Sequence, residues 1–222
     1  MTRLPISTLN LSPLPAIEPL RKRMQQMAAL TAVVGIEFGT PPFEFHPRWA
    51  RGEQMGAYKN GSGDELFVHF TPAGCFMKGF AHESTMSPYR TNPPTLWPGL
   101  FDGLPVQFAS SLQESAFDIP STTFAVWRLA ADPDWHIGQI KVPQHYYGDG
   151  SQDLLVRLVM SAEEFTQWLA ENYEAEVDTD VVIAVFEHQP LTKGQLRTLQ
   201  PLAKLAELLR VVEETGYPVN DR

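Results

Sequence analysis

The stretch GFAHESTMSPY, residues 79–89, concentrates side chains that could do chemistry. It carries His82, Glu83, Ser87 and Tyr89 directly after an apolar run, where a loop supported by a sheet would present them. A histidine beside a carboxylate can move protons, and hydroxyl groups can donate or accept hydrogen bonds. Three interpretations follow: an active site, a binding loop, or a structural turn in which the serines bond nearby amides.

The start of this stretch matches half of a zinc motif. H-E-x-x-H places two histidines on one face of a helix, but Met86 stands at the second histidine position and Pro88 opposes a helix. A metal site would instead have to be assembled from separate strands, with His69, Cys75 and His82 as its ligands. We expect no bound metal.

Two other motifs are incomplete. NGSG around Ser62 lacks the first glycine of G-x-S-x-G, and GSGDEL has Leu66 at the third glycine position of a dinucleotide loop. Cys75 lies in an apolar run, which is typical of an inert buried thiol. We therefore expect no cofactor. A hydrolase of unknown substrate that uses His82 and Glu83 is the alternative function.

A long helix is predicted near the N-terminus. Apolar residues recur at steps of three and four from Ile17 to Val34, Pro19 fits the first turn, and Gly35 is a stop signal. The preceding residues, 1–15, read as a partly ordered tail. They form neither a signal peptide nor a membrane span, because they have no continuous apolar run.

An antiparallel meander of about five or six strands is predicted between Phe43 and Val142. Two hairpin turns are predicted, NGSGD at residues 60–64 and TPAG at residues 71–74. Glycine and asparagine accept the positive φ that such turns need, and proline holds its own φ at a negative value that suits the first position of a turn. The segment LWPGLFDGLPVQFASSL, residues 96–112, predicts one or two short helical turns before the last strand pair. The expected strands are FEFH (43–46), QMGAYKN (54–60), ELFVHF (65–70), CFMKGF (75–80), STTFAVWRLA (121–130) and WHIGQIKVP (135–143).

The C-terminal third is predicted to be helical. Ser161 with Glu164 and Thr192 with Gln195 are capping boxes, and a final helix ends at Gly216. Strands followed by helices indicate the α+β class. We expect a single domain over residues 16–222, sheet-rich at 43–142 and helical at 151–218, with YGDGS at residues 147–151 as the one plausible internal boundary.

Composition narrows the function. The 222 residues include 43% hydrophobic residues and one cysteine, which fits a globular, soluble protein of a reducing compartment such as the cytoplasm. The net charge of -9 and the lack of a basic stripe argue against nucleic-acid binding and favour a basic protein partner. Tyr89, Trp97 and Trp135 are the aromatic residues expected at an interface, whereas Trp127 is expected in the core.

The run NGSGDELFVHFTPAGCFMKGFAHESTMSPY, with PLT at residues 190–192, resembles bacterial proteins of unassigned function. Among them are small acidic proteins that are encoded beside toxin genes and read as immunity proteins. The resemblance spans about residues 56–100, and the chain lacks the proline-containing helix entry of the SUKH-type immunity fold, so no functional residue is carried over. It implies an acidic cytosolic α+β protein that recognises another protein. The exposed polar and aromatic residues described above predict, separately, that the loop at residues 81–92 makes the contact.

Overall fold

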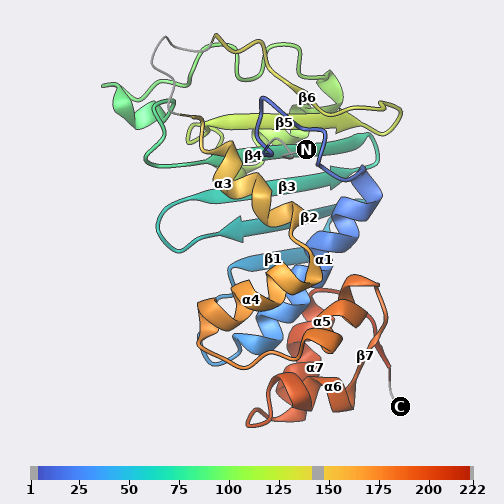
Figure 1. The fold of residues 1–222 in the computed structure, drawn as a ribbon. Coiled ribbons are helices and arrows are strands. Elements are labelled where there is room, and N and C mark those ends of the chain that lie inside the picture. The colour runs from blue at the N-terminus through green and yellow to red at the C-terminus, as the bar shows by residue number, and fades with distance from the viewer. Residues whose placement is uncertain (1–4, 142–147, 221–222) are drawn as a thin grey trace.

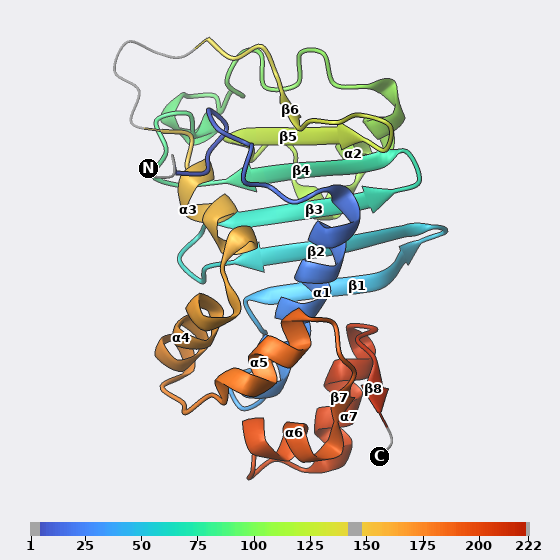
Figure 2. The ribbon, with the colours of Figure 1, turned by 45° about the vertical axis from the view of Figure 1, so that its right-hand side comes forward.

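The computed structural model describes residues 5–141 and 148–220. A long helix, α1 (Ile17–Val34), crosses one face of a six-stranded antiparallel sheet and continues past the first edge strand, where the C-terminal helices surround it (Figures 1 and 2). The fold is α+β, as predicted. No helix within the two described stretches is long and apolar enough to cross a membrane.

The helix α1 has the predicted bounds, and it is buried on nearly all sides. Leu20, Met24 and Met27 have no exposed surface, because they pack against the sheet. On the side away from the sheet, the buried amides of Gln25 and Gln26 donate hydrogen bonds to carbonyl oxygens of the C-terminal helical region, at 3.1 and 3.2 Å. Hydrogen bonds thus satisfy the polar groups that this central position buries.

The sheet is a meander in which every strand pairs with the next in sequence. The hairpin turn between the second and third strands is held by Asn60, whose Oδ1 accepts hydrogen bonds from the amides of Ser62 and Asp64. Gly61 and Gly63 have positive φ in that turn, which explains the choice of glycine. The predicted meander is confirmed, with strands β1 (Phe43–Ala50), β2 (Glu53–Lys59), β3 (Glu65–Thr71), β4 (Gly74–Phe80), β5 (Phe124–Leu129) and β6 (His136–Ile137).

The two faces of the sheet are covered by different parts of the chain. Leu66, Val68 and Phe70 of β3 face the core that α1 shares, as predicted. On the other face, Phe76 and Trp127 pack under the segment after β4. The helical turns predicted at residues 96–112 are present, as η2 (Val106–Phe108) and α2 (Ala109–Gln113). Two further turns, η1 (Pro88–Arg90) and η3 (Ser115–Phe117), were not predicted.

The C-terminal third is mostly helical, and both predicted capping boxes form, at Ser161 with Glu164 and at Thr192 with Gln195. A two-stranded parallel pair joins Leu191 to Val219 and was not predicted, because strands of two residues carry no alternation signal. The elements are α3 (Ser151–Leu155), η4 (Val156–Val159), α4 (Ala162–Tyr173), α5 (Thr179–Phe186), β7 (Leu191–Thr192), α6 (Lys193–Leu199), α7 (Leu205–Glu214) and β8 (Val219–Asn220).

One apolar cluster runs from the sheet through α1 into the C-terminal helices. The N-terminal segment joins it, because Ile6 and Leu14 are buried and the amide of Thr8 donates to Ser151 Oγ at 3.0 Å. Part of the predicted tail, residues 1–4, lies outside the described residues. So do residues 142–147, which include the end of the predicted sheet-rich region and the start of the predicted boundary.

Candidate functional site

The loop at residues 81–92 leaves the end of β4 and is fixed by its own side chains. Ser84 Oγ accepts a hydrogen bond from the amide of Met86 at 3.0 Å and donates to the carbonyl of Gly148 at 3.1 Å. Arg90 Nε donates to the carbonyl of Ser84 at 3.1 Å. These bonds tie the loop to the segment before α3 and to itself, so its exposed residues are presented in one arrangement.

His82 is paired with a carboxylate that the sequence did not single out. Its Nδ1 lies 2.7 Å from Asp64 Oδ1, and its backbone amide donates to the same oxygen at 2.9 Å. Asn60 Nδ2 holds the other oxygen of Asp64 at 2.9 Å. The imidazole is 45% exposed, and its Nε2 lies 3.9 Å from Glu83 Oε1. A histidine oriented in this way by an aspartate can act as a general base.

Tyr89 is the exposed aromatic residue of the loop. The residue is 60% exposed, yet its hydroxyl lies 2.7 Å from Ser121 Oγ. Its ring packs edge-on against Phe80, with 5.8 Å between the ring centroids. A shallow hollow of about 540 Å³ lies beside it. The hollow contains no charged side chain and is lined by Tyr89, Pro94, Thr95, Leu96, Ile119 and Pro120.

The other predicted binding residues lie in different surroundings. Ser87 is 5% exposed and Trp135 is 9% exposed, and the indole N–H of Trp135 donates to the carbonyl of Pro15 at 2.9 Å beneath the N-terminal segment. Trp97 is partly exposed and donates to the carbonyl of Lys141 at 3.1 Å. Of the predicted binding residues, His82, Glu83 and Tyr89 are therefore the ones exposed on this loop, together with Arg90, Thr91 and Asn92. Trp127 is buried, as predicted.

The metal site considered from the sequence does not assemble. Cys75 is on the α1 face of the sheet, whereas His69 is on the opposite face and His82 turns toward Asp64. Burial raises the pKa of the Cys75 thiol, which makes it unreactive. The two described stretches hold no cluster of three or more metal-ligating side chains.

A serine–histidine–glutamate chain lies under α2, and sequence reasoning missed it. His69 Nδ1 is 2.9 Å from Ser111 Oγ, and His69 Nε2 is 3.0 Å from Glu53 Oε2. A nucleophile must reach its substrate, but Ser111 has no exposed surface and His69 is almost fully buried. Burial lowers the pKa of His69, so the ring is neutral near pH 7. The hydrogen bonds between Ser111, His69 and Glu53 therefore join α2 to the sheet, and the buried Ser111 is not placed to act as a nucleophile.

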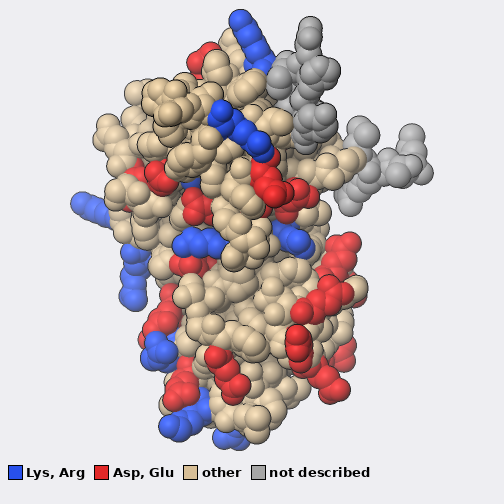
Figure 3. All heavy atoms as spheres, turned by 90° about the vertical axis from the view of Figure 1, so that its left-hand side faces the viewer, with Lys and Arg blue, Asp and Glu red and all other residues tan. Residues whose placement is uncertain are grey.

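The negative charge is concentrated in the C-terminal helices. Residues 158–192 contain eight acidic residues and no lysine or arginine, so they carry -8 of the net -9 and leave -1 for the rest of the chain. All eight are exposed. Figure 3 views the molecule from the left-hand side of Figure 1, the side toward which the end of α4 points. Carboxylates gather on the lower right of that view. The eight acidic residues of the range 158–192 are Glu163, Glu164, Glu171, Glu174, Glu176, Asp178, Asp180 and Glu187.

Comparisons of the chain with protein-family models, with curated proteins and with solved structures give no match. The resemblance to immunity proteins therefore stays an expectation from the sequence.

Proposed function

We propose that the chain is a protein-binding protein, of the type that immunity proteins represent, and that it recognises its partner through the loop at residues 81–92. The observation that carries this proposal is Tyr89, which exposes 60% of its surface although its hydroxyl is held by Ser121. An aromatic side chain that is already fixed before binding loses little conformational entropy when a partner covers it.

The hollow beside Tyr89 supports the proposal, because an apolar side chain of a partner would fill it without desolvating a charge. The exposed acidic residues of α4 and α5 support a basic partner, since opposite charges raise the rate of encounter. Figure 1 places the loop after β4 at the upper left and the end of α4 lower on the same side, so one partner could meet both.

The test compares three variants of the purified protein, Tyr89→Ala, Tyr89→Phe and Val106→Ala. Val106 is 82% exposed and serves as the matched surface control. The partner is first captured with a photo-crosslinking residue at position 91 and identified by mass spectrometry, and its affinity is then measured by calorimetry. Tyr89→Ala should weaken binding by about 1–3 kcal/mol, whereas Tyr89→Phe and Val106→Ala should change it little. Equal affinity for all three would remove Tyr89 from the interface.

A hydrolase is the second candidate, and the pairing of His82 with Asp64 favours it. No hydrogen bond or ion pair links His82 to a serine, threonine or cysteine side chain within the described stretches, so His82 would have to activate water. The test assays the protein against a broad panel of esters and peptides. Turnover that is lost in both His82→Ala and Asp64→Asn, while the melting temperature of each variant stays unchanged, would establish an enzyme and displace the binding proposal.

A further inference from the structure

A pocket of about 390 Å³ lies between the N-terminal segment and the hairpin that joins β5 to β6, on the face of the sheet that α1 covers. Leu11 and Leu14 line it from the N-terminal segment, and Arg128 lines it from β5. Trp135 and Ile137 contribute from the hairpin. The volume lies at the small end of the range of about 300–1,000 Å³ that is typical of ligand pockets.

Arg128 is held in place by the hairpin but keeps two of its nitrogens free. Its Nε donates to the carbonyl of Asp132 at 2.9 Å, and its guanidinium carbon lies 5.9 Å from the ring centroid of Trp135. The carboxylate of Asp132 is used elsewhere, because it accepts from the amide of Leu129 at 3.3 Å and lies 3.4 Å from His136 Nε2. The two terminal nitrogens of Arg128 have no hydrogen-bond partner among the described residues, and their planar geometry suits a carboxylate.

Asp134 brings a negative charge to the same pocket. It is exposed, and its carboxylate forms no hydrogen bond or ion pair with the part of the chain that the structure describes. Arg128 and Asp134 also do not pair with each other, so within residues 5–141 and 148–220 neither has a partner of opposite charge. The pocket therefore presents one cation and one anion that are both available to a ligand.

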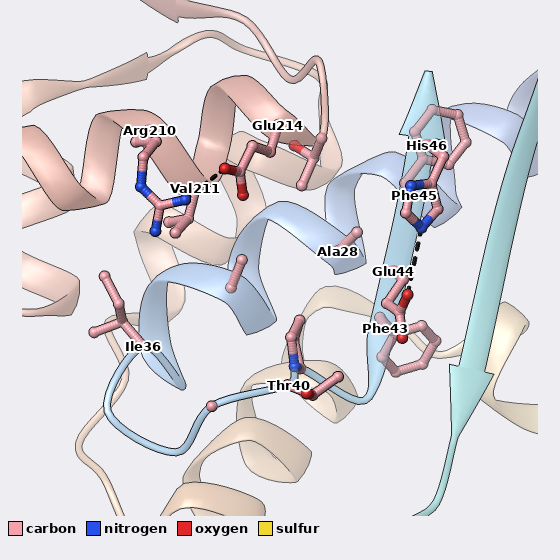
Figure 4. Close-up of a pocket in the computed structure, with 14 residues that line it drawn as sticks. Ala28, Ile36, Thr40, Phe43, Glu44, Phe45, His46, Arg210, Val211 and Glu214 are labelled. Atoms are coloured by element: carbon pink, nitrogen blue, oxygen red, sulfur yellow. Dashed lines mark hydrogen bonds and ion pairs between the residues drawn. The ribbon is translucent and has the colours of Figure 1, made fainter. Parts of the chain in front are cut away.

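The charged side chains of a second hollow, a groove of about 720 Å³ between α1, β1 and α7, are already paired (Figure 4). Arg210 is paired with Glu214, and Glu44 is paired with His46 and with Lys59. A charged ligand would have to break one of these pairs in order to bind in the groove. The smaller pocket requires no such break.

We propose that the smaller pocket binds a free amino acid with an apolar side chain. A zwitterion brings a carboxylate for the guanidinium of Arg128 and an ammonium for the carboxylate of Asp134. A simple anion would meet the like charge of Asp134, and a simple cation would meet that of Arg128. A neutral apolar molecule would take both charges out of water without giving either a partner. An amino acid is therefore the class of small ligand that satisfies both charges.

The rest of the lining selects the side chain of the ligand. Leu11 and Ile137 are partly buried residues that pack against the core, and Leu14 and Trp135 belong to the core itself. Thr8 also lines the pocket, but it donates its hydroxyl hydrogen to a buried carboxylate. An apolar side chain of the ligand would remove this apolar lining from water, which favours leucine, methionine or phenylalanine over polar amino acids.

The test titrates the full-length protein with L-leucine, L-methionine and L-phenylalanine in a calorimeter, and at least one of them should bind saturably. The tightest of the three is then compared with the same molecule without its ammonium and with the same molecule without its carboxylate. For leucine these analogues are 4-methylpentanoate and 3-methylbutylamine. Each analogue should bind at least about tenfold more weakly, because each leaves one charge of the pocket without its partner. Glycine, which has no side chain, should also bind more weakly.

Variants of the protein locate the site. Asp134→Asn should lower the affinity for the amino acid by at least about tenfold and raise the affinity for the analogue without the ammonium, because the ligand carboxylate no longer meets a like charge. Asp102→Asn changes another exposed aspartate, whose carboxylate has no partner in the described stretches and lies outside the pocket, so both affinities should stay unchanged. Arg128→Gln should abolish binding. The gain of binding by Asp134→Asn tests the proposal even if Arg128→Gln fails to fold.

The proposal would be overturned if none of the three amino acids bound saturably to the wild-type protein, or if the analogue without the ammonium bound as tightly as the amino acid. An unchanged affinity in Asp134→Asn would also overturn it. Binding that a folded Arg128→Gln variant retains would place the ligand elsewhere on the protein, with the same consequence. Because the pocket shares no residue with the loop at residues 81–92, none of these outcomes depends on the proposed function of that loop.

Discussion

Lys78 Nζ lies 2.9 Å from Glu65 Oε1 on the neighbouring strand, and the Lys78 side chain has no exposed surface. The ammonium also lies 5.3 Å from the ring centroid of Phe67. Burial lowers the pKa of Lys78, and the hydrogen bond with Glu65 opposes that shift. Glu65 keeps 26% of its side chain exposed, so the cation depends on the carboxylate more than the carboxylate depends on the cation.

The two partners should therefore respond differently to substitution. Glu65→Gln leaves a buried ammonium without its hydrogen-bonded carboxylate, with only the more distant charge of Asp118, and should lower the free energy of unfolding by about 3–5 kcal/mol. Lys78→Met keeps the apolar stem and leaves a carboxylate that water can reach, so its cost should stay below about 1.5 kcal/mol. Urea unfolding at pH 7 measures both. Equal losses would show that the pair is symmetric and contradict this reasoning.

His69 should make stability depend on pH. Glu53 and Glu114 favour the protonated ring, but burial outweighs them and lowers its pKa below the ordinary value of 6.5. The unfolded chain then takes up a proton at a higher pH than the folded chain does, so stability falls as the pH drops below about 6.5.

The corresponding experiment measures the free energy of unfolding between pH 7.5 and pH 5. His69→Gln should be less stable at pH 7.5, because it loses the bonds to Ser111 and Glu53, and its stability should fall less steeply with acidification. His46→Gln, at an exposed position, is the control for loss of a surface histidine. If the free energy of unfolding of His69→Gln fell with pH as steeply as that of the wild-type protein, the prediction would be contradicted.

Two glycines without positive φ should respond in opposite ways to alanine. A Cβ on Gly79 would lie 2.1 Å from the ring of Phe124, so Gly79→Ala should cost about 1–3 kcal/mol. A Cβ on Gly194 in α6 would meet nothing closer than 3.8 Å, so Gly194→Ala should stabilise the helix by about 0.5–1 kcal/mol. Thermal melts of both variants give the comparison, and a neutral Gly79→Ala would show that the Phe124 ring can move aside.

The local parts of the fold could be predicted because their causes are local. The α1 helix, the hairpin turn at Asn60 and the two capping boxes each depend on residues within a few positions of one another. The pairing of Asp64 with His82 was within reach, because a hairpin between β3 and β4 brings the residues before and after it together. The motifs around His82 do not include Asp64, because the two residues lie 18 positions apart and meet only when β3 and β4 pair.

Other features depend on long-range packing and could not be predicted. The contact of His69 with Ser111 spans 42 residues and requires the helical turns after β4 to fold back over the sheet. The burial of Trp135 requires the N-terminal segment, because its indole donates to Pro15 across 120 residues.

The N-terminal segment supplies the last prediction. Thr8 Oγ1 donates a hydrogen bond to Asp149 Oδ2, and Asp149 is almost fully buried although it is a carboxylate. Its other oxygen accepts from the amide of Ser151. Thr8→Val keeps the shape of the side chain and removes the donor, so it leaves one oxygen of a buried carboxylate without its partner.

We expect Thr8→Val to lower the free energy of unfolding by about 1–3 kcal/mol and to speed hydrogen exchange at residues 5–15 before the sheet amides exchange. Leu9→Ala, at a neighbouring residue that is 71% exposed, is the matched control and should change neither quantity. Because the amide of Thr8 also donates to Ser151 Oγ, the segment should stay bound to the sheet on average in the variant. Identical exchange in Thr8→Val and wild type would mean that the apolar contacts of Ile6 and Leu14 alone hold this segment in place.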